Sequence, residues 1–140
     1  MRRSDLARTV FGLIFVSAGI LHFTFPDYYR AFVPAYLPAP SALVAVSGVA
    51  EVAGGVGLLL PRWRQAAGLG LILLLIAVLP ANVEMLRHGR ARGVGVAGET
   101  MLWLRLPFQI VLMWAAWRLS RPRYAVDPGL GTGRREMRLR

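Results

Sequence analysis

Four long apolar blocks joined by short connections limit what this chain can fold into. The blocks span residues 6–25, 41–60, 66–85 and 102–119. At about 1.5 Å of rise per residue, each is long enough for a helix to cross a hydrocarbon layer about 30 Å thick. Backbone polar groups in that layer must be satisfied within the segment, which favours helices. We therefore expect an all-α integral membrane protein, a four-helix antiparallel bundle formed as one domain by residues 1–120.

The distribution of arginine predicts the orientation of this bundle. The chain has 17 basic residues, all of them arginine; twelve lie in the two terminal tails and the second connection, and five lie near the first and third connections. Because basic residues gather on the cytoplasmic side, we expect a multi-pass membrane protein with both termini in the cytoplasm. The basic tail, residues 121–140, is rich in glycine and is expected to be disordered.

Charge and cysteine content exclude several classes of protein. The formal net charge is +10, but most arginines stand at the ends of the apolar blocks. This placement is typical of membrane orientation, so the expected partner is the lipid bilayer and not a specific nucleic acid. The chain contains no cysteine. Thiol–disulfide chemistry, thioether attachment of haem and iron–sulfur ligation by cysteine are therefore excluded.

The first connection is rich in aromatic residues. It carries Tyr28, Tyr29, Phe32 and Tyr36 within residues 26–40. Aromatic rings with one polar end favour the interface between membrane and water. We expect an extracytoplasmic lid that lies along the headgroups. A plain aromatic belt explains the same residues equally well.

Glu51 lies at the centre of the second apolar block. A carboxylate in mid-membrane costs about 2.5 to 3.5 kcal/mol on insertion scales, so it normally faces a partner or a cavity. Counting the helical rise from the block ends places further polar residues towards the outer side of the membrane. The candidate ligand- or partner-binding residues are therefore His22, Glu51, Asn82, Glu84, Arg105 and Gln109. Together they are expected to form one funnel.

Most of these residues also have a purely structural interpretation. Glu84 and Arg105 could pair and hold two helices together. Glu51 needs a partner from another helix, and Gln109 and Arg105 are the candidates. Asn82 and Gln109 each follow a proline by two residues, and both could satisfy carbonyl groups freed by a kink. The sequence does not decide whether Arg105 pairs with Glu51 or with Glu84.

Small residues predict where the helices pack closely. Gly12 and Gly19 are spaced by seven, about two helical turns, so they share a face of the first block. Gly48, Gly54 and Gly55 provide small positions in the second block. Small residues allow helix backbones to approach one another in membranes. We expect close contacts within the bundle at these positions.

The polar residues do not form a familiar catalytic or metal site. A zinc site needs three or four protein ligands, but only His22 and two glutamates are candidates. Haem ligation by two histidines would need His88, which falls in the third connection near the surface. No catalytic residues are therefore assigned. Hydrogen bonding to a small polar head, such as a quinone carbonyl, or proton relay through His22 and Glu51 remains open.

Several stretches carry a family resemblance. They are residues 18–23 (AGILHF), 33–38 (VPAYLP), 47–59 (SGVAEVAGGVGLL), 80–83 (PANV) and 104–109 (LRLPFQ). Together they resemble the DoxX-like family of small four-helix bacterial membrane proteins over about residues 10–118. The resemblance implies four helices with both termini inside. The positions that match the family pattern are His22, Glu51, Asn82, Arg105 and Gln109.

The resemblance also implies a link to membrane redox systems. The family takes its name from a subunit of a terminal quinol oxidase or thiosulfate:quinone oxidoreductase, and other members are linked to oxidoreductase assemblies in oxidative stress. We expect a non-catalytic membrane subunit that binds a partner or a quinone-like small molecule. Its partners would be membrane oxidoreductase subunits or further copies of itself, and a quinone is the candidate cofactor.

Two alternative functions make different demands on the same residues. A small transporter or proton-coupled carrier needs a polar path through both leaflets, yet the inner halves of the four blocks are apolar. A structural or assembly protein needs its polar groups only to bond helix to helix. In that case Glu51 would be fully satisfied within the protein and no cavity would surround it.

Overall fold

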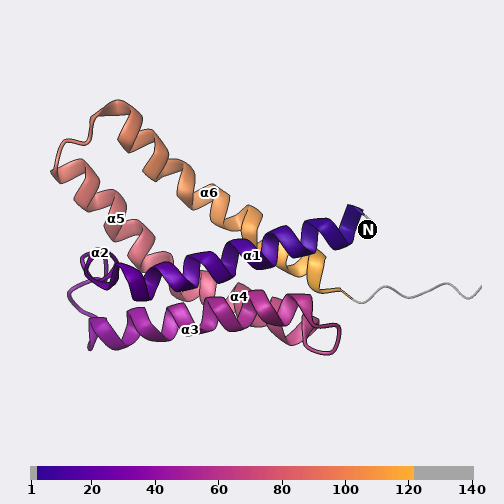
Figure 1. Ribbon diagram of the computed structural model, residues 1–140. Coiled ribbons are helices and arrows are strands. Elements are labelled where there is room, and N and C mark those ends of the chain that lie inside the picture. Colours follow the sequence, from indigo (N-terminus) through magenta and orange to yellow (C-terminus); the bar gives the residue numbers. More distant parts are fainter. Residues whose placement is uncertain (1–2, 122–140) are drawn as a thin grey trace, which may run out of the picture.

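Helices account for all regular secondary structure in residues 3–121, the part of the chain that this computed structural model describes (Figure 1). In chain order they are α1 (Arg3–Thr24), α2 (Pro26–Arg30), α3 (Pro40–Leu59), α4 (Arg64–Ala77), α5 (Leu79–Ala91) and α6 (Gly95–Ser120). The expected all-α class is confirmed for this part of the chain. Residues 122–140 lie outside the described part, so the disorder predicted for the basic tail stays a prediction.

Three helical segments of the described residues are long and apolar enough to cross a membrane. They are Ser4–Thr24, Pro40–Leu59 and Arg64–Ala91, the last of which combines α4 and α5. They indicate a multi-pass membrane protein, as expected. The fourth predicted span, residues 102–119, is helical within α6 but is not one of these three. Arg105 and Gln109, both strongly polar, interrupt its apolar run and lower its mean hydropathy.

The third predicted span is divided into two helices at Val78. Pro80 stands in the first turn of α5, where its missing N–H group costs least. The same residue cannot donate to the carbonyl four positions earlier, so α4 ends at Ala77. Beyond the break α5 runs on to Ala91, which places His88 on a helix and shortens the expected third connection to a turn.

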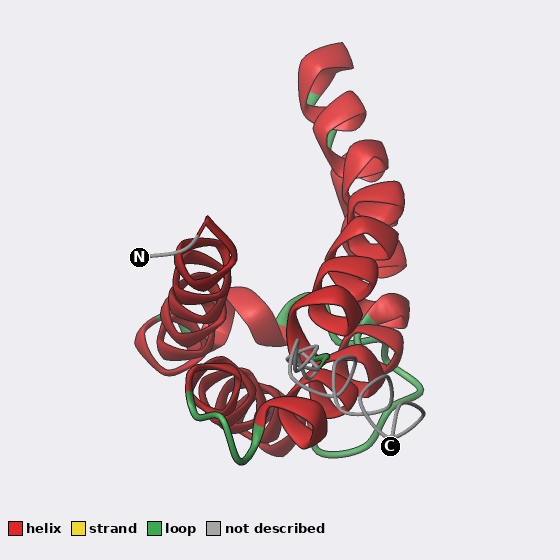
Figure 2. Ribbon diagram, turned by 90° about the vertical axis from the view of Figure 1, so that its right-hand side faces the viewer, coloured by secondary structure: helices red, strands yellow, loops and turns green. Residues whose placement is uncertain are grey.

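The helices pack as a series of neighbours and not as a closed bundle. α1 packs against α3, α3 against α4, α4 against α6, and α6 against α5, whereas α1 meets α6 only weakly. The hairpin of α5 and α6 diverges from α1 towards the end opposite the N-terminus (Figure 1), and it rises away from the α1–α3 pair in the view of Figure 2. The expected bundle is therefore open on the side between α1 and the α5–α6 hairpin.

Glycines bring α1 and α3 into close contact, as predicted. A Cβ atom on Gly12 would lie 2.8 Å from the Gly55 carbonyl oxygen, and one on Gly19 would lie 2.6 Å from the Gly48 carbonyl oxygen. Such distances leave no room for a larger side chain. The seven-residue spacing in α1 therefore marks its packing face on α3.

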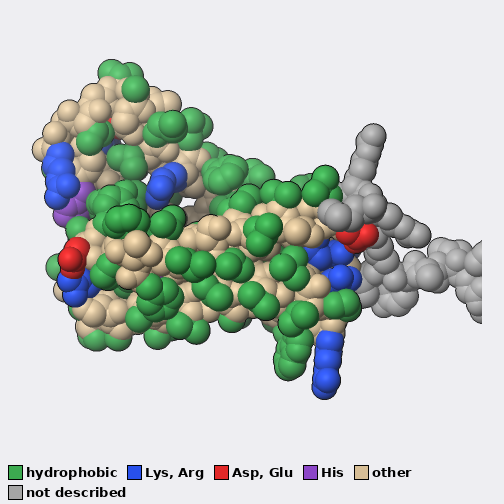
Figure 3. All heavy atoms as spheres, in the orientation of Figure 1, with side chains coloured by type: hydrophobic (Ala, Val, Ile, Leu, Met, Phe, Trp, Pro, Cys, Tyr) green, Lys and Arg blue, Asp and Glu red, His purple; other side chains and the backbone are tan. Residues whose placement is uncertain are grey.

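The buried core lies where α1, α3, α4 and α6 meet. Its members are Phe11, Phe15, Leu58, Leu71, Leu75 and Ala116. Elsewhere, hydrophobic side chains cover much of the outer surface, and Figure 3 shows them spread along the length of the helices. Apolar surface of this extent indicates contact with lipid.

Candidate functional site

The close approach of α1 and α3 brings His22 next to Glu51. His22 lies three residues after Gly19, and Glu51 lies three residues after Gly48, so each pair is about one turn apart on its helix. A Cβ atom on Gly48 would lie 2.9 Å from the Cβ atom of His22. The same contact that joins the helices thus sets the distance between the two polar side chains.

The contact between the two side chains is close but leaves one carboxylate oxygen unsatisfied. Nδ1 of His22 lies 3.3 Å from Oε2 of Glu51, and the two side chains are only 11% and 14% exposed. Nδ1 is also 3.0 Å from the carbonyl oxygen of Ala18. A carbonyl can only accept, so Nδ1 carries a proton that is directed at Ala18. Oε2 of Glu51 is buried and has no hydrogen-bond donor among the described residues.

Tyr29, on the short helix α2, covers this pair. Its ring stacks on the imidazole of His22 with the ring centroids 3.9 Å apart and the planes at 22°. Burial raises the pKa of the Tyr29 phenol, and the nearby Glu51 and Tyr28 act in the same direction, whereas Arg105 opposes them. The phenol therefore stays neutral at physiological pH. Glu51 and Arg105 both lie close enough to influence it.

The other aromatic residues of the predicted lid divide into two groups. Tyr28 packs edge-on against Tyr29 at 5.5 Å and against Phe32 at 5.1 Å between centroids. Phe32 in turn packs edge-on against His88 of α5 at 6.1 Å. Tyr36 lies apart, 75% exposed, beside a separate groove. Three of the four residues thus form one aromatic layer next to His22.

Arg105 forms neither of the two ion pairs considered from the sequence. Its Nη1 atom lies 3.1 Å from the sulfur of Met85. Glu84 instead interacts along its own helix, with Arg87 at 3.2 Å and His88 at 3.3 Å. Among the described residues no carboxylate is paired with Arg105. Residues three or four positions apart are neighbours on a helix surface, which favours the partners that Glu84 has on α5.

Gln109 is not the partner of Glu51. It is buried, with 2% of its surface exposed. Its Nε2 donates to the carbonyl oxygen of Leu75, and its Oε1 accepts from Nδ2 of Asn82 at 3.0 Å. Leu75 lies in the last turn of α4, where carbonyl groups lack partners within the helix. Asn82 and Gln109 therefore stabilise the break between α4 and α5.

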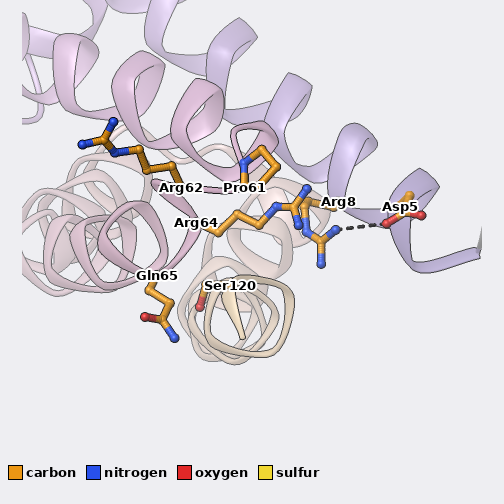
Figure 4. Close-up of a pocket in the computed structure, with 7 residues that line it drawn as sticks. All are labelled: Asp5, Arg8, Pro61, Arg62, Arg64, Gln65 and Ser120. Atoms are coloured by element: carbon orange, nitrogen blue, oxygen red, sulfur yellow. Dashed lines mark hydrogen bonds and ion pairs between the residues drawn. The ribbon is translucent and has the colours of Figure 1, made fainter. Parts of the chain in front are cut away.

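Two cavities stand out, and neither takes in His22 or Glu51. One, of about 380 Å³, runs from Pro34 and Tyr36 to Glu84 and Arg87 on α5. The other, of about 490 Å³, lies at the opposite end, and Figure 4 shows the residues that line it: Asp5, Arg8, Pro61, Arg62, Arg64, Gln65 and Ser120. Neither cavity is therefore the pocket that was expected to join His22, Glu51 and Arg105. The pair of His22 and Glu51 is enclosed beneath Tyr29.

Sequence reasoning named Tyr29 only as one of four lid residues, and it did not propose Arg8 as part of a site. Nothing in the pattern of the first connection distinguishes Tyr29, which stacks on His22, from its aromatic neighbours. Arg8 is one of the twelve arginines that the sequence relates to membrane orientation, yet it is buried and donates from α1 to a carbonyl group of α6. A single arginine inside the apolar run of α1 was the available signal.

Comparisons with known proteins identify a family but no described relative. No curated protein and no solved structure matches this chain. One family covers most of its length, including α3 to α5 in full and both His22 and Glu51. The chain belongs to the family described as Domain of unknown function (DUF8561), which matches residues 11–120.

Proposed function

We propose that this protein is a non-catalytic membrane subunit that binds the polar head of a lipid-soluble small molecule, with a quinone or quinol as the candidate. The observation that carries this proposal is the buried, unpartnered Oε2 of Glu51 beside His22 and beneath Tyr29. A buried acceptor without a donor is costly, and in native proteins it usually marks a functional group. A bound hydroxyl group would supply the missing donor.

The surroundings of Glu51 suit such a head group. The neutral phenol of Tyr29 and the second ring nitrogen of His22, Nε2, provide further hydrogen-bonding groups. α2 is only five residues long, and none of its residues is buried, so a small displacement of this helix would uncover the pair. The open side between α1 and the α5–α6 hairpin offers apolar surface for the tail of the ligand.

The proposal also extends to family and topology. The motifs around His22 and Glu51 support a DoxX-like subunit of a redox or oxidative-stress system in the bacterial inner membrane. Its partner would be a membrane oxidoreductase subunit or a second copy of this chain. α6 would form a fourth span, because its 26 residues extend about 39 Å at 1.5 Å per residue. With four spans both termini would lie in the cytoplasm, in agreement with the distribution of arginine.

The test is to measure bound quinone after purification in mild detergent from quinone-containing membranes. Wild type, Glu51→Gln and Glu84→Gln are compared by extraction and mass spectrometry. Glu51→Gln should lower the ratio of total quinone and quinol to protein about tenfold, because the hydroxyl group of the bound quinol loses the carboxylate to which it donates a charge-assisted hydrogen bond. Glu84→Gln is the matched control, because Glu84 already has partners on α5, and it should retain the ligand. Equal quinone in wild type and Glu51→Gln, or none in wild type, would contradict the proposal.

A proton-coupled carrier is a second candidate, favoured by the 3.3 Å contact between two titratable groups, His22 and Glu51. The buried core of Phe11, Leu58 and Leu71 opposes it, because apolar side chains fill the region that a proton path would have to cross. Proton flux into proteoliposomes that disappears in Glu51→Gln would favour the carrier. Absence of flux in the wild type would remove it.

A further inference from the structure

The cavity of about 490 Å³ lies where three chain segments meet at the end opposite Tyr29. α1 begins there, the turn from α3 to α4 passes through it, and α6 ends there. Among the described residues that line it, three of seven are arginines, and Asp5 is the one acidic residue. The cavity is thus a positively charged space and is separate from the site of His22 and Glu51.

Two of the arginines are held in place by backbone carbonyl groups. Nε of Arg8 donates to the carbonyl oxygen of Leu119 at 3.0 Å, and Nη1 of Arg8 donates to Asp5 at 3.1 Å. Nε of Arg64 donates to the carbonyl oxygen of Leu58 at 3.3 Å. Leu119 and Leu58 lie in the last turns of α6 and α3, whose carbonyl groups attract cations. Both guanidinium groups are therefore oriented before any ligand arrives.

The ends of these two side chains point towards one another. In Figure 4 the side chain of Arg64 extends towards Arg8, whereas that of Arg62 points away from both. Arg62 lies over the ring of Trp63, 5.8 Å from its centroid. The terminal nitrogens of Arg64 make no hydrogen bond to any described residue. The positive charge of Arg64 has no carboxylate partner among the described residues, so it would attract an anion that enters the cavity.

A phosphate group is the anion that this arrangement fits best. The planar fork of arginine pairs with two oxygens of a phosphate at once, and paired arginines recognise phosphate better than single point charges do. Gln65 also lines the cavity, but its amide group points away from the two guanidinium groups in Figure 4. The hydroxyl of Ser120, which also lines the cavity, already donates to the carbonyl oxygen of Trp117 at 3.0 Å. The carboxylate of Asp5 is occupied by Arg8, which limits its repulsion of an incoming anion.

We propose that this cavity binds a phosphate-bearing anion, held chiefly by Arg64 and Arg8. The phosphate belongs to the headgroup of an anionic lipid or to a soluble ion. The cavity stands at the ends of three membrane helices, where basic residues meet anionic headgroups.

The experiment measures lipid binding by native mass spectrometry on the full chain, delipidated in mild detergent. Phosphatidylglycerol and phosphatidylcholine are added separately to wild type, Arg64→Gln and Arg87→Gln. Wild type should prefer phosphatidylglycerol, and Arg64→Gln should bind it about tenfold more weakly, as expected for loss of a charged hydrogen bond. Arg87→Gln is the matched control: Arg87 is 74% exposed at the other end of the molecule and should leave binding unchanged.

A second arm identifies the source of the phosphate. The Tm of wild type and of Arg64→Gln is measured with and without inorganic phosphate. If phosphate raises the Tm of wild type alone and wild type shows no preference for phosphatidylglycerol, the ligand is a soluble ion.

A second variant, Arg64→Lys, keeps the charge but loses the planar guanidinium group. It should bind phosphatidylglycerol with intermediate strength even if Arg64→Gln folds poorly. Equal binding of both lipids by wild type together with no response to inorganic phosphate would overturn the proposal. Equal binding of phosphatidylglycerol by wild type and both Arg64 variants would overturn it as well.

Discussion

Two polar contacts between helices are completed to different degrees in this protein. At the break between α4 and α5, Gln109 joins Asn82 and the carbonyl group of Leu75, and every polar atom named there has a partner. Between α1 and α3, His22 approaches Glu51, but Oε2 of Glu51 is left without a donor. A completed network serves to hold helices together. An incomplete one whose unsatisfied atom is buried is the better candidate for binding.

The largest expected effect comes from forcing α1 and α3 apart. Gly48→Leu places side-chain atoms where His22, Phe23 and the Gly19 carbonyl group already lie. Overpacking of this kind should lower the free energy of unfolding by about 3 kcal/mol. Denaturation by sodium dodecyl sulfate, followed by circular dichroism, measures the change. Gly70→Leu is the control, because a Cβ atom there meets nothing within 4 Å. Equal losses in both variants would contradict the proposed role of the α1–α3 contact.

The next effect comes from breaking the completed network. Gln109→Leu leaves the Leu75 carbonyl group and the Asn82 amide without partners, and it should lower the free energy of unfolding by about 2 kcal/mol. Asn82→Leu should cost about 1 kcal/mol, because Gln109 still satisfies Leu75. The double variant should be no less stable than Gln109→Leu alone. Losses that simply add would show that the two side chains act independently.

The incomplete contact should tolerate substitution better than the completed one. Glu51→Gln keeps the shape of the side chain and removes no hydrogen bond that Oε2 makes within the described residues. We expect a change in the free energy of unfolding of less than about 1 kcal/mol, measured by the same denaturation. A loss as large as that of Gln109→Leu would mean that Glu51 is structural, and the distinction between the two contacts would fail.

The smallest effect is a shift in the titration of Tyr29. Because its pKa is raised in the folded protein, the neutral phenol is favoured, and its contribution to stability is lost only as the pH rises above about 10. Ultraviolet absorbance of tyrosinate should show a phenol that ionises above the ordinary pKa of tyrosine. Tyr29→Phe should remove that late step, whereas Tyr36→Phe, at an exposed position, should not. Removal of the late step by both variants would contradict the assignment.

Elements that depend on local composition could be predicted closely. The first two spans follow from apolar length, whereas the third was expected as one span with a kink near Pro80 and is divided there into α4 and α5. The packing face of α1 follows from Gly12 and Gly19, because a seven-residue spacing is a local property of one helix. The fourth span was expected from a similar block, but Arg105 and Gln109 make that block less apolar than the others. Its crossing of the membrane stays a proposal.

The partners of the polar residues could not be predicted in the same way. Gln109 and Arg105 were the expected partners of Glu51, but His22 is the residue beside it. Which residue lies beside Glu51 depends on how α1 is rotated against α3 and on how far α6 diverges from α1. Neither quantity is encoded by spacing within one helix. The same reason applies to Arg8, whose partner Leu119 is 111 positions away.

The sequence by itself determined that this chain is helical, apolar enough to enter a membrane, and marked by one acidic residue at the centre of a span. Helical period, apolar length and charge act over a few neighbouring residues, so a single chain displays them. Only the tertiary structure decided that His22 meets Glu51 under Tyr29, that Gln109 completes the α4–α5 break, and that Arg8 and Arg64 face one cavity. Each of these contacts joins separate helices, and its geometry depends on the distance and rotation between them.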